Sequence, residues 1–375
     1  MIRTSPSIRR AVLSALAAGL ALAACSPKPV PIGPQRTSPR GGHGGSPTGS
    51  PGTLPSGSGP PTVIPRAEPL PLGDLTEEGG SDSMCPPGFT CHAFTVDCPG
   101  VERADPGFYA VSEIPDGAAG MAVFFNAGPG KRYWGEEQAP QDFLGSVVDA
   151  GLVVVEVRWQ IPWQLAEPGE DAGPAALACR PATAIRFMHD TLYPDLGLTP
   201  EAGAGACGFC LVGSSSGASQ VAYALTHYGL QDLVDAAVLT SGPVHGALAA
   251  GCLIGGGEGY GAYARVIDRA YGYANGEGPC RAHDPSWEER WLEDGVATGG
   301  AAYDYPDTRV QFIAGERDHG VQGLAHPYFE RLVASGTPEV GFAVIPGMGH
   351  GIKGSAEGLD SLLRALTTAR VDNPG

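Results

Sequence analysis

The sequence predicts an α/β domain built on a mostly parallel sheet of about eight strands, with helices on both faces. Two observations favour this class. Short apolar runs recur between residues 89 and 345, and helix-like segments separate the later runs. Strands that alternate with helices usually form a parallel sheet that is covered on both sides. The stretch of roughly 290 residues after residue 80 is long enough for one such domain.

The apolar runs give the expected strands directly. They cover residues 89–96, 107–111, 121–125, 152–157, 209–212, 236–239, 310–314 and 341–345. Helix-like segments follow at 181–190 and 218–228, and the second ends at Gly229, a natural helix stop. Because ligands bind outside the carboxyl ends of parallel strands, the functional residues are expected in the segments that follow these runs.

Residues 213–217 read Gly-Ser-Ser-Ser-Gly, a Gly-x-Ser-x-Gly pentapeptide between an expected strand and an expected helix. A strained turn at this place exposes the hydroxyl of Ser215, and side chains at Gly213 or Gly217 would obstruct the turn. The pentapeptide alone is a weak signal in a chain with 57 glycines. A serine nucleophile also needs a base, an acid that orients the base, and donors for the oxyanion.

His350 is the predicted base. It lies between Gly349 and Gly351, directly after the last expected strand. A buried loop histidine with a purely structural hydrogen bond is the alternative. Small residues on both sides favour the catalytic interpretation.

Asp318 is the predicted acid, because it follows the expected strand at 310–314 within a few residues. Glu316 and Asp307 compete for this role, and a surface turn aspartate is the structural alternative. The order along the chain is serine, aspartate, histidine.

The oxyanion donors are expected in the loop Asn126-Ala127-Gly128-Pro129-Gly130, which follows the strand at 121–125. The backbone N–H of Ala127 or Gly128, together with that of Ser216, is predicted to hold the negative oxygen. Pro129 has no N–H to donate. A tight Gly-Pro turn without a catalytic role is the alternative.

The pentapeptide, the oxyanion loop and the order Ser215, Asp318, His350 together resemble the α/β-hydrolase superfamily over about residues 90–370. The resemblance implies the α/β-hydrolase fold and a serine hydrolase that cleaves a small-molecule ester or acyl substrate through an acyl-enzyme. Water then releases the acyl group.

Two departures from the family pattern leave the subfamily open. Asn126 stands where the oxyanion loop usually has a histidine, and Ser214 and Ser216 flank the nucleophile. Esterase, lipase, peptidase and acyltransferase activities all fit, as does a non-catalytic binding lipoprotein of the same fold. A peptidase needs an ionised residue to hold a substrate amine, for which the candidates are Glu258, Glu277 and Asp284.

Residues 243–303, after the sixth expected strand, break the strand-helix pattern and are rich in glycine and aromatic residues. The resemblance implies a lid that shapes specificity here. A surface excursion held by a disulfide is the alternative. Trp159 and Trp163 follow the fourth expected strand and either line the pocket or pack in the core, with packing favoured.

The N-terminus predicts export. Residues 1–24 combine arginines with a short apolar stretch, which is typical of a signal peptide. The sequence Leu22-Ala23-Ala24-Cys25 resembles a bacterial lipobox, so we expect cleavage before Cys25 and attachment of acyl chains such as palmitate. The mature chain would be a membrane-anchored lipoprotein, periplasmic or on the cell surface. Plain secretion after an Ala-x-Ala site is the alternative.

Residues 25–80 are rich in Pro, Gly and Ser and are expected to form a disordered tether ahead of a catalytic domain at 81–375. The net charge of −17 argues against nucleic acid as a partner and against electrostatic docking on anionic lipid. Membrane contact is therefore expected only through the lipid at Cys25.

Eight of the nine cysteines remain after Cys25 is set aside, which suggests up to four disulfides in an exported chain. Cys252 with Cys280 would clamp the lid, and Cys85 would pair with Cys91 or Cys98. Cys207 and Cys210 are expected to find partners elsewhere, because residues three apart in a strand point to opposite faces. No cluster has convincing metal-ligand spacing, so neither a metal nor a cofactor is expected.

Overall fold

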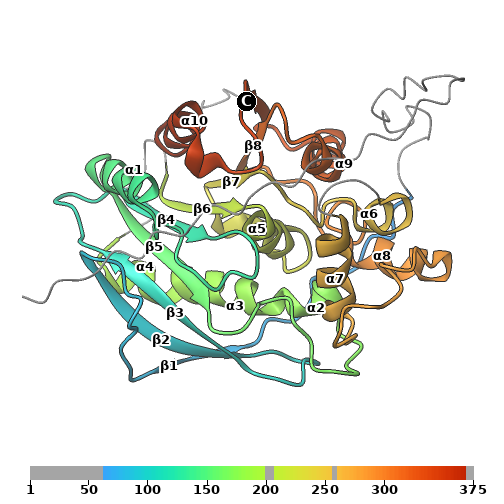
Figure 1. Cartoon of the computed structure of the whole chain (residues 1–375). Helices are drawn as coiled ribbons and strands as arrows, with labels where there is room; N and C mark the ends of the chain where they lie inside the picture. Colours follow the sequence, from blue (N-terminus) through green and yellow to red (C-terminus); the bar gives the residue numbers. More distant parts are fainter. Residues whose placement is uncertain (1–61, 199–206, 256–259, 369–375) are drawn as a thin grey trace, which may run out of the picture. The chain divides into compact units, whose positions relative to one another are not determined.

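The computed structural model of the chain describes residues 62–198, 207–255 and 260–368. It contains a nine-stranded sheet in the order β1-β2-β3-β5-β4-β6-β7-β8-β9 (Figure 1). The strands are β1 (Asp74–Glu78), β2 (Phe89–Asp97), β3 (Asp105–Ser112), β4 (Gly120–Phe125), β5 (Leu152–Trp159), β6 (Phe209–Ser214), β7 (Ala236–Thr240), β8 (Arg309–Gly315) and β9 (Val340–Ile345). Neighbours from β5 to β9 pair in parallel, whereas β1, β2, β3 and β5 pair antiparallel. The predicted α/β class with a mostly parallel sheet is confirmed.

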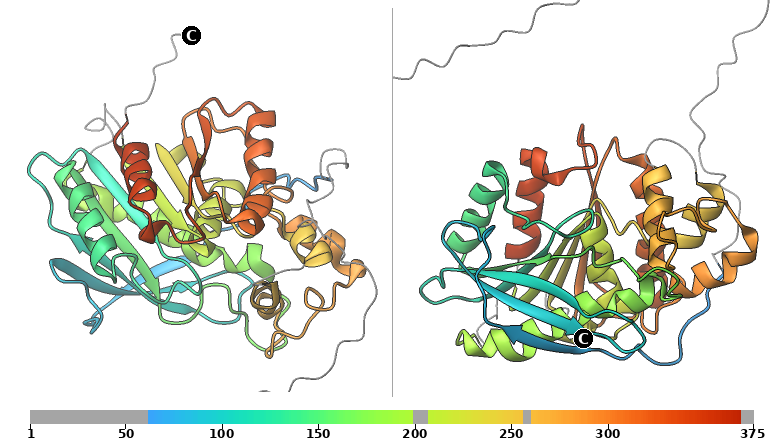
Figure 2. Two further views of the ribbon diagram at one scale, coloured as in Figure 1. Left: turned by 45° about the horizontal axis from the view of Figure 1, so that its top comes forward. Right: turned by 60° about the horizontal axis from the view of Figure 1, so that its bottom comes forward.

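Helices cover both faces of this sheet. They are α1 (Gln138–Asp149), α2 (Gly173–Leu177), α3 (Cys179–Phe187), α4 (Tyr193–Asp195), α5 (Ser216–Thr226), α6 (Leu248–Ile254), α7 (Tyr260–Ala270), α8 (Glu288–Asp294), α9 (His319–Ser335) and α10 (Ala356–Thr367), with short turns η1 (Met188–Leu192), η3 (Gln231–Leu233), η4 (Pro285–Trp287) and η5 (Ile352–Gly354). Helices α1 and α10 lie side by side on one face, as Figures 1 and 2 show, and α3, α5 and α9 pack on the other.

Strand β4 shows how the sheet separates two apolar cores. Val123 and Phe125 belong to the core under α3, α5 and α9, whereas Ala122 and Phe124 belong to the core under α1 and α10. Successive side chains of a strand point to opposite faces, so a strand covered on both sides is apolar throughout. All six residues of β4 are buried. Its carboxyl end meets those of β6, β7, β8 and β9 at one edge of the sheet.

Each of the eight expected strands is present, and a ninth, β1, was not expected. Strand β1 has the sequence Asp-Leu-Thr-Glu-Glu, and four of its five residues are exposed. It pairs only with β2, at the edge of the sheet. A polar edge strand leaves no apolar run in the sequence, so the predicted tether at 25–80 extends too far. The chain joins the sheet by residue 74.

Four disulfides join cysteines in the described part of the chain, and one prediction about them is wrong. The pairs are Cys85–Cys91, Cys98–Cys179, Cys207–Cys210 and Cys252–Cys280. Cys207 and Cys210 were expected to pair elsewhere, but β6 begins only at Phe209 and the chain bends at Gly208. The alternation of side chains therefore does not extend back to Cys207, and the two Cα atoms lie 5.8 Å apart.

The segment between β7 and β8, predicted to be a lid at 243–303, forms α6, α7 and α8 around an apolar cluster of its own. Leu248, Ile267 and Trp291 pack there against the Cys252–Cys280 disulfide. The segment contacts α2 and α9, and Figure 1 shows its helices gathered beside α5. Its role as a lid stays a prediction.

The predicted signal peptide and lipobox, Cys25 included, lie outside the described residues. Within the ranges that are described, no helix is both long and apolar enough to cross a bilayer.

Candidate active site

Ser215 occupies the sharp turn between β6 and α5. Its backbone has φ 55° and ψ −113°, a conformation that residues other than glycine rarely adopt. The Ser215 N–H donates to the carbonyl of Thr240 at 2.8 Å, which fixes the turn to the end of β7. The turn places the serine side chain at the carboxyl edge of the sheet.

The two glycines of the pentapeptide are required by close backbone packing. A Cβ at Gly217 would lie 2.2 Å from the carbonyl oxygen of Phe125, and one at Gly213 would lie 2.4 Å from that of Gly217. The turn therefore rests directly against the end of β4. This contact brings Ser215 next to the loop predicted to supply the oxyanion donors.

His350 links Ser215 to Asp318. Its Nε2 lies 2.9 Å from the Ser215 Oγ, and its Nδ1 lies 2.8 Å from an Asp318 carboxylate oxygen. In this arrangement the neutral imidazole donates from Nδ1 to Asp318 and accepts the serine proton at Nε2. The structure thus brings together the three residues that were predicted from separate parts of the sequence.

Asp318 changes the pKa of this histidine. The hydrogen bond to Asp318 raises the pKa of His350 above its ordinary value, burial opposes the rise, and the negative charge of Asp318 adds to it. The Asp318 side chain is 11% exposed and that of His350 is 50% exposed. The histidine is therefore held firmly on one side and open to solvent on the other.

The position of the His350 loop depends on residues other than its flanking glycines. A Cβ at Gly349 or Gly351 would meet nothing within 4 Å, so the expectation that these positions need small residues is wrong. The loop is held instead by Glu316, whose carboxylate accepts from the Gly347 N–H at 2.8 Å, and by Arg317, which donates to the Gly347 carbonyl.

The competing acids have other positions. Glu316 is engaged by Gly347, as described above. Asp307 precedes β8 and so lies at the amino end of that strand, whereas Asp318 follows its carboxyl end. The topology of β8 therefore excludes Asp307, whereas Glu316 differs from Asp318 in its partner, because it binds Gly347 and Asp318 binds His350.

The oxyanion loop shows which of the predicted donors are available. The Ala127 N–H donates to the side-chain oxygen of Asn126 at 2.8 Å, so it is already engaged. The N–H groups of Gly128 and Ser216 donate to no acceptor among the described residues. The Ser216 hydroxyl donates to the Gly128 carbonyl, which keeps the two segments together. Of the three predicted donors, the geometry favours Gly128 and Ser216.

Sequence reasoning missed the side chains that hold this loop. Lys353 donates from Nζ to the Asn126 Oδ1 at 2.9 Å and to the Trp134 carbonyl at 2.6 Å. Glu156 accepts from the Gly135 N–H at 2.5 Å. One signal was present: Glu156 is the single charge inside the apolar run 152–157. A charge within a buried strand requires a partner.

Burial shifts the pKa values of Glu156 and Lys353 away from their ordinary values. Burial raises the pKa of Glu156 to about 7, although the Gly135 N–H and the charge of Lys353 oppose the rise. Burial lowers the pKa of Lys353 to about 8, and the charge of Glu156 opposes that change. Glu156 and Lys353 therefore both change protonation near neutral pH.

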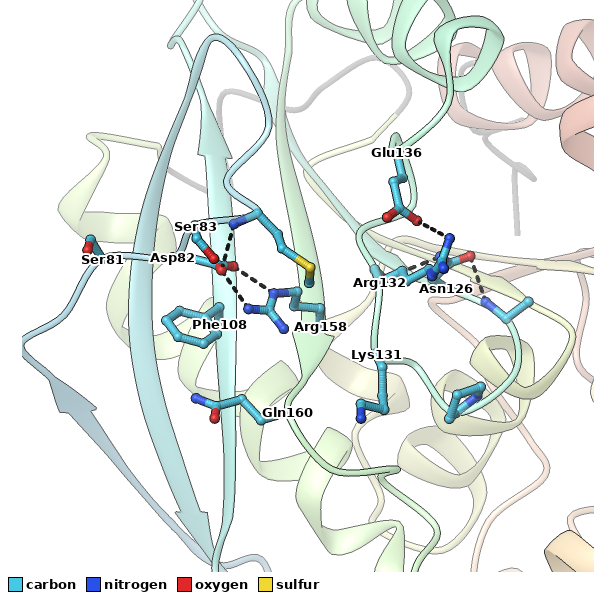
Figure 3. Close-up of a pocket in the computed structure, with 13 residues that line it drawn as sticks. Ser81, Asp82, Ser83, Phe108, Asn126, Lys131, Arg132, Glu136, Arg158 and Gln160 are labelled. Atoms are coloured by element: carbon cyan, nitrogen blue, oxygen red, sulfur yellow. Dashed lines mark hydrogen bonds and ion pairs between the residues drawn. The ribbon is translucent and has the colours of Figure 1, made fainter. Parts of the chain in front are cut away.

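A cavity of about 740 Å³ opens beside the oxyanion loop (Figure 3). Asn126, Ala127 and Pro129 form one wall, and Phe108 and Arg158 form the other. Figure 3 shows the Arg158 guanidinium turned onto Asp82, to which it donates two hydrogen bonds of 2.6 Å. The cavity therefore adjoins the oxyanion loop, whereas Ser215, His350, Gly128 and Ser216 are not among the residues that line it.

Trp159 and Trp163 are fully buried, which confirms the core-packing interpretation. The indole N–H of Trp159 donates to the Gln220 side chain at 2.9 Å, and that of Trp163 donates to the Ser216 hydroxyl at 3.3 Å. Both tryptophans thus contact the first turns of α5, which follow Ser215.

The acidic residues considered for a peptidase have structural partners where they are described. Glu277 pairs with Arg281 at 2.8 Å, and the Asp284 carboxylate accepts from the Ser286 N–H at 3.0 Å. Glu258 lies outside the described residues. In the described part of the chain no group of three or more His, Cys, Asp or Glu side chains is placed to hold a metal ion.

No protein-family profile and no curated protein matches the chain. Solved structures with a similar arrangement include brefeldin A esterase, described as a bacterial homologue of human hormone sensitive lipase, with 16% identity over 77% of this chain and 78% of that one and a TM-score of 0.49. A hyperthermophilic esterase from the archaeon Pyrobaculum calidifontis shares 15% identity over 73% of this chain and 80% of that one, with a TM-score of 0.45. An acylaminoacyl peptidase from Pyrococcus horikoshii shares 16% identity over 77% of this chain and 43% of that one, with a TM-score of 0.42. Likenesses this distant identify no substrate.

Proposed function

The chain has the α/β-hydrolase fold, and from this premise we propose that it is a serine hydrolase that cleaves carboxylic esters through an acyl-enzyme. One observation carries the proposal. The Ser215 Oγ, the His350 ring and the Asp318 carboxylate form a continuous hydrogen-bonded chain, with contacts of 2.9 and 2.8 Å. A serine hydroxyl becomes an effective nucleophile when a base in this position accepts its proton.

The reaction follows from this geometry in two steps. The Ser215 Oγ attacks the acyl carbon while its proton passes to the His350 Nε2, and the carbonyl oxygen becomes negative within reach of the Gly128 and Ser216 N–H groups. The alcohol leaves with the proton that His350 returns. A water molecule then attacks the acyl-enzyme, gives a proton to His350, and releases the carboxylic acid as the serine recovers its hydrogen.

Asp318 stabilises the imidazolium that forms in both steps and keeps the ring in the productive tautomer. The half-exposed His350 side chain gives the hydrolytic water access to the acyl-enzyme. These features support transfer of the acyl group to water.

We also propose that the enzyme works as an exported lipoprotein anchored at Cys25. The lipobox-like Leu-Ala-Ala-Cys sequence at 22–25 is the basis of this proposal. Four disulfides among eight cysteines support it, because such bonds persist in oxidising compartments outside the cytoplasm.

The activity is tested with matched substrates. The purified chain is assayed with p-nitrophenyl acetate, p-nitrophenyl butyrate and an aminoacyl p-nitroanilide, alongside Ser215→Ala and the control Ser146→Ala on the exposed face of α1. We expect ester turnover that falls by at least about 10³-fold in Ser215→Ala and stays unchanged in the control. Faster turnover of the anilide than of the esters would replace the esterase proposal with a peptidase.

A further inference from the structure

We propose that Lys353 is a positioning residue for the reaction. Its ammonium group joins the oxyanion loop to the loop that carries the catalytic base. This inference rests on the proposed function and names a residue that acts through others. Lys353 lies in η5, three residues after His350, so one short segment supplies both the base and the ammonium group.

The Lys353 ammonium binds the first residue of the oxyanion loop and the segment that follows the loop. Its Nζ donates to the Asn126 Oδ1 at 2.9 Å and to the carbonyl of Trp134, beyond Gly130, at 2.6 Å. The same nitrogen lies 4.8 Å from the centre of the Trp134 ring, within the range of a cation–π interaction. A single charged group therefore ties the start of the oxyanion loop to Trp134.

The Asn126 amide transmits this contact to the oxyanion donors. Its oxygen accepts from both Lys353 and the Ala127 N–H, and its nitrogen donates to the carbonyls of Arg132 and Tyr133 at 3.2 and 2.9 Å. The orientation of the amide is thus fixed from two sides. Gly128, with φ 63°, follows within two residues, so its N–H direction depends on the same contacts.

The contact with Trp134 reaches the other half of the site. The Trp134 indole N–H donates to the Ser214 hydroxyl at 2.9 Å, directly before the nucleophile. Ser214 in turn contacts the Thr240 hydroxyl at 2.8 Å, and the Thr240 carbonyl accepts from the Ser215 N–H. Lys353 therefore contacts Asn126, which orients Gly128. It also contacts Trp134, which packs beside the turn that carries Ser215.

The charges around Lys353 make its role depend on pH. Glu156 faces it from β5 and is fully buried, while Glu136 and Glu137 approach from the segment before α1. Burial lowers the pKa of Lys353 to about 8, and these carboxylates limit the fall. The ammonium is present below this pKa and lost above it. Replacing Glu156 by glutamine removes the largest opposing charge, which lowers the pKa of Lys353 further.

The first test compares Lys353→Met, which keeps the length without the charge, with Lys353→Arg, which keeps the charge. Arg364→Met, on the exposed face of α10, is the matched control for loss of a cation. With p-nitrophenyl butyrate as substrate, we expect kcat of Lys353→Met to fall by about 10- to 100-fold and its KM to change by less than about twofold. Lys353→Arg should recover part of the lost kcat. The control should match the wild type.

A second readout separates positioning from a merely structural role. A trifluoromethyl ketone that adds to Ser215 places a negative oxygen in the oxyanion site, so its Ki should rise in Lys353→Met by the factor by which kcat/KM falls. The wild-type kcat should decline above a pH near 8. This alkaline limb should move to lower pH in Glu156→Gln and to higher pH in Lys353→Arg.

The outcomes separate this inference from the proposed function. An active wild type with an equally active Lys353→Met, or an alkaline limb that neither Lys353→Arg nor Glu156→Gln moves, would overturn the role of Lys353 alone. A folded wild type that cleaves no ester would overturn the proposed function. If Lys353→Met does not fold, the pH limbs of the wild type, Lys353→Arg and Glu156→Gln decide the matter.

Discussion

At the scale of single residues, the site is defined by contacts between parts of the chain that are far apart in sequence. Ser215, His350 and Asp318 were predictable because each follows an apolar strand and each has a side chain suited to its role. Lys353 and Asn126 are 227 residues apart, and no spacing rule connects them. Their contact exists only because β4 and β9 end at the same edge of the sheet.

The pKa of His350 gives a prediction about the acidic limb of activity. The base must be neutral, and Asp318 raises its pKa above the ordinary value of about 6.5. The value of kcat/KM should therefore fall as the pH drops through this raised pKa. In Asp318→Asn the limb should shift to lower pH, and kcat should fall by about 10³- to 10⁴-fold because the ring loses its orienting carboxylate.

Steady-state profiles between pH 5 and 9 measure both effects. Asp360→Asn, an exposed carboxylate on α10, provides the control for loss of one negative charge and should leave the limb in place. An unshifted acidic limb in Asp318→Asn would show that Asp318 does not set the protonation of the base.

At the scale of elements, the turn between β6 and α5 depends on close contact with β4. A methyl group at residue 217 would meet the carbonyl oxygens of Phe125 and Asn126 at 2.2 and 2.7 Å. We expect Gly217→Ala to displace the oxyanion loop, which lowers kcat by about 100-fold or more, and to lower the free energy of unfolding by about 1–3 kcal/mol.

Turnover and urea unfolding of Gly217→Ala are compared with those of Gly145→Ala. Gly145 lies inside α1, and a Cβ there would meet nothing within 4 Å. Alanine favours a helix over glycine, so this control should be slightly more stable than the wild type and equally active. Wild-type turnover in Gly217→Ala would contradict the close packing of the turn.

Elements differ in how well the sequence predicts them, and burial is the reason. Strands β4 to β8 are covered on both faces, so their apolar runs stand out in the sequence. Strand β1 is an exposed edge, and its sequence Asp-Leu-Thr-Glu-Glu contains no apolar run. The disulfide between Cys98 and Cys179 joins the loop after β2 to the start of α3, 81 residues later, and sequence spacing alone does not identify such a pair.

At the scale of the whole molecule, the acidic folded domain is expected to depend on Cys25 for membrane attachment. A net charge of −17 gives no attraction to an anionic bilayer. When the full chain is made in a bacterial host fed radiolabelled palmitate, it should incorporate the label and sediment with membranes.

Cys25→Ser should lose both properties while ester turnover per molecule stays the same, and Ser26→Ala should keep both. A wild-type chain that is exported without label would favour simple secretion. A Cys25→Ser chain that still sediments with membranes would point to another mode of attachment.

Labelling with a fluorophosphonate probe shows whether Ser215 is an activated nucleophile. The purified chain is treated with the probe, and the modified residue is identified by mass spectrometry in the wild type and in His350→Ala. We expect a single modification at Ser215 in the wild type and its loss in His350→Ala, because the base is required to activate the hydroxyl. A folded wild-type protein that remains unmodified, or that reacts at another residue, would contradict it.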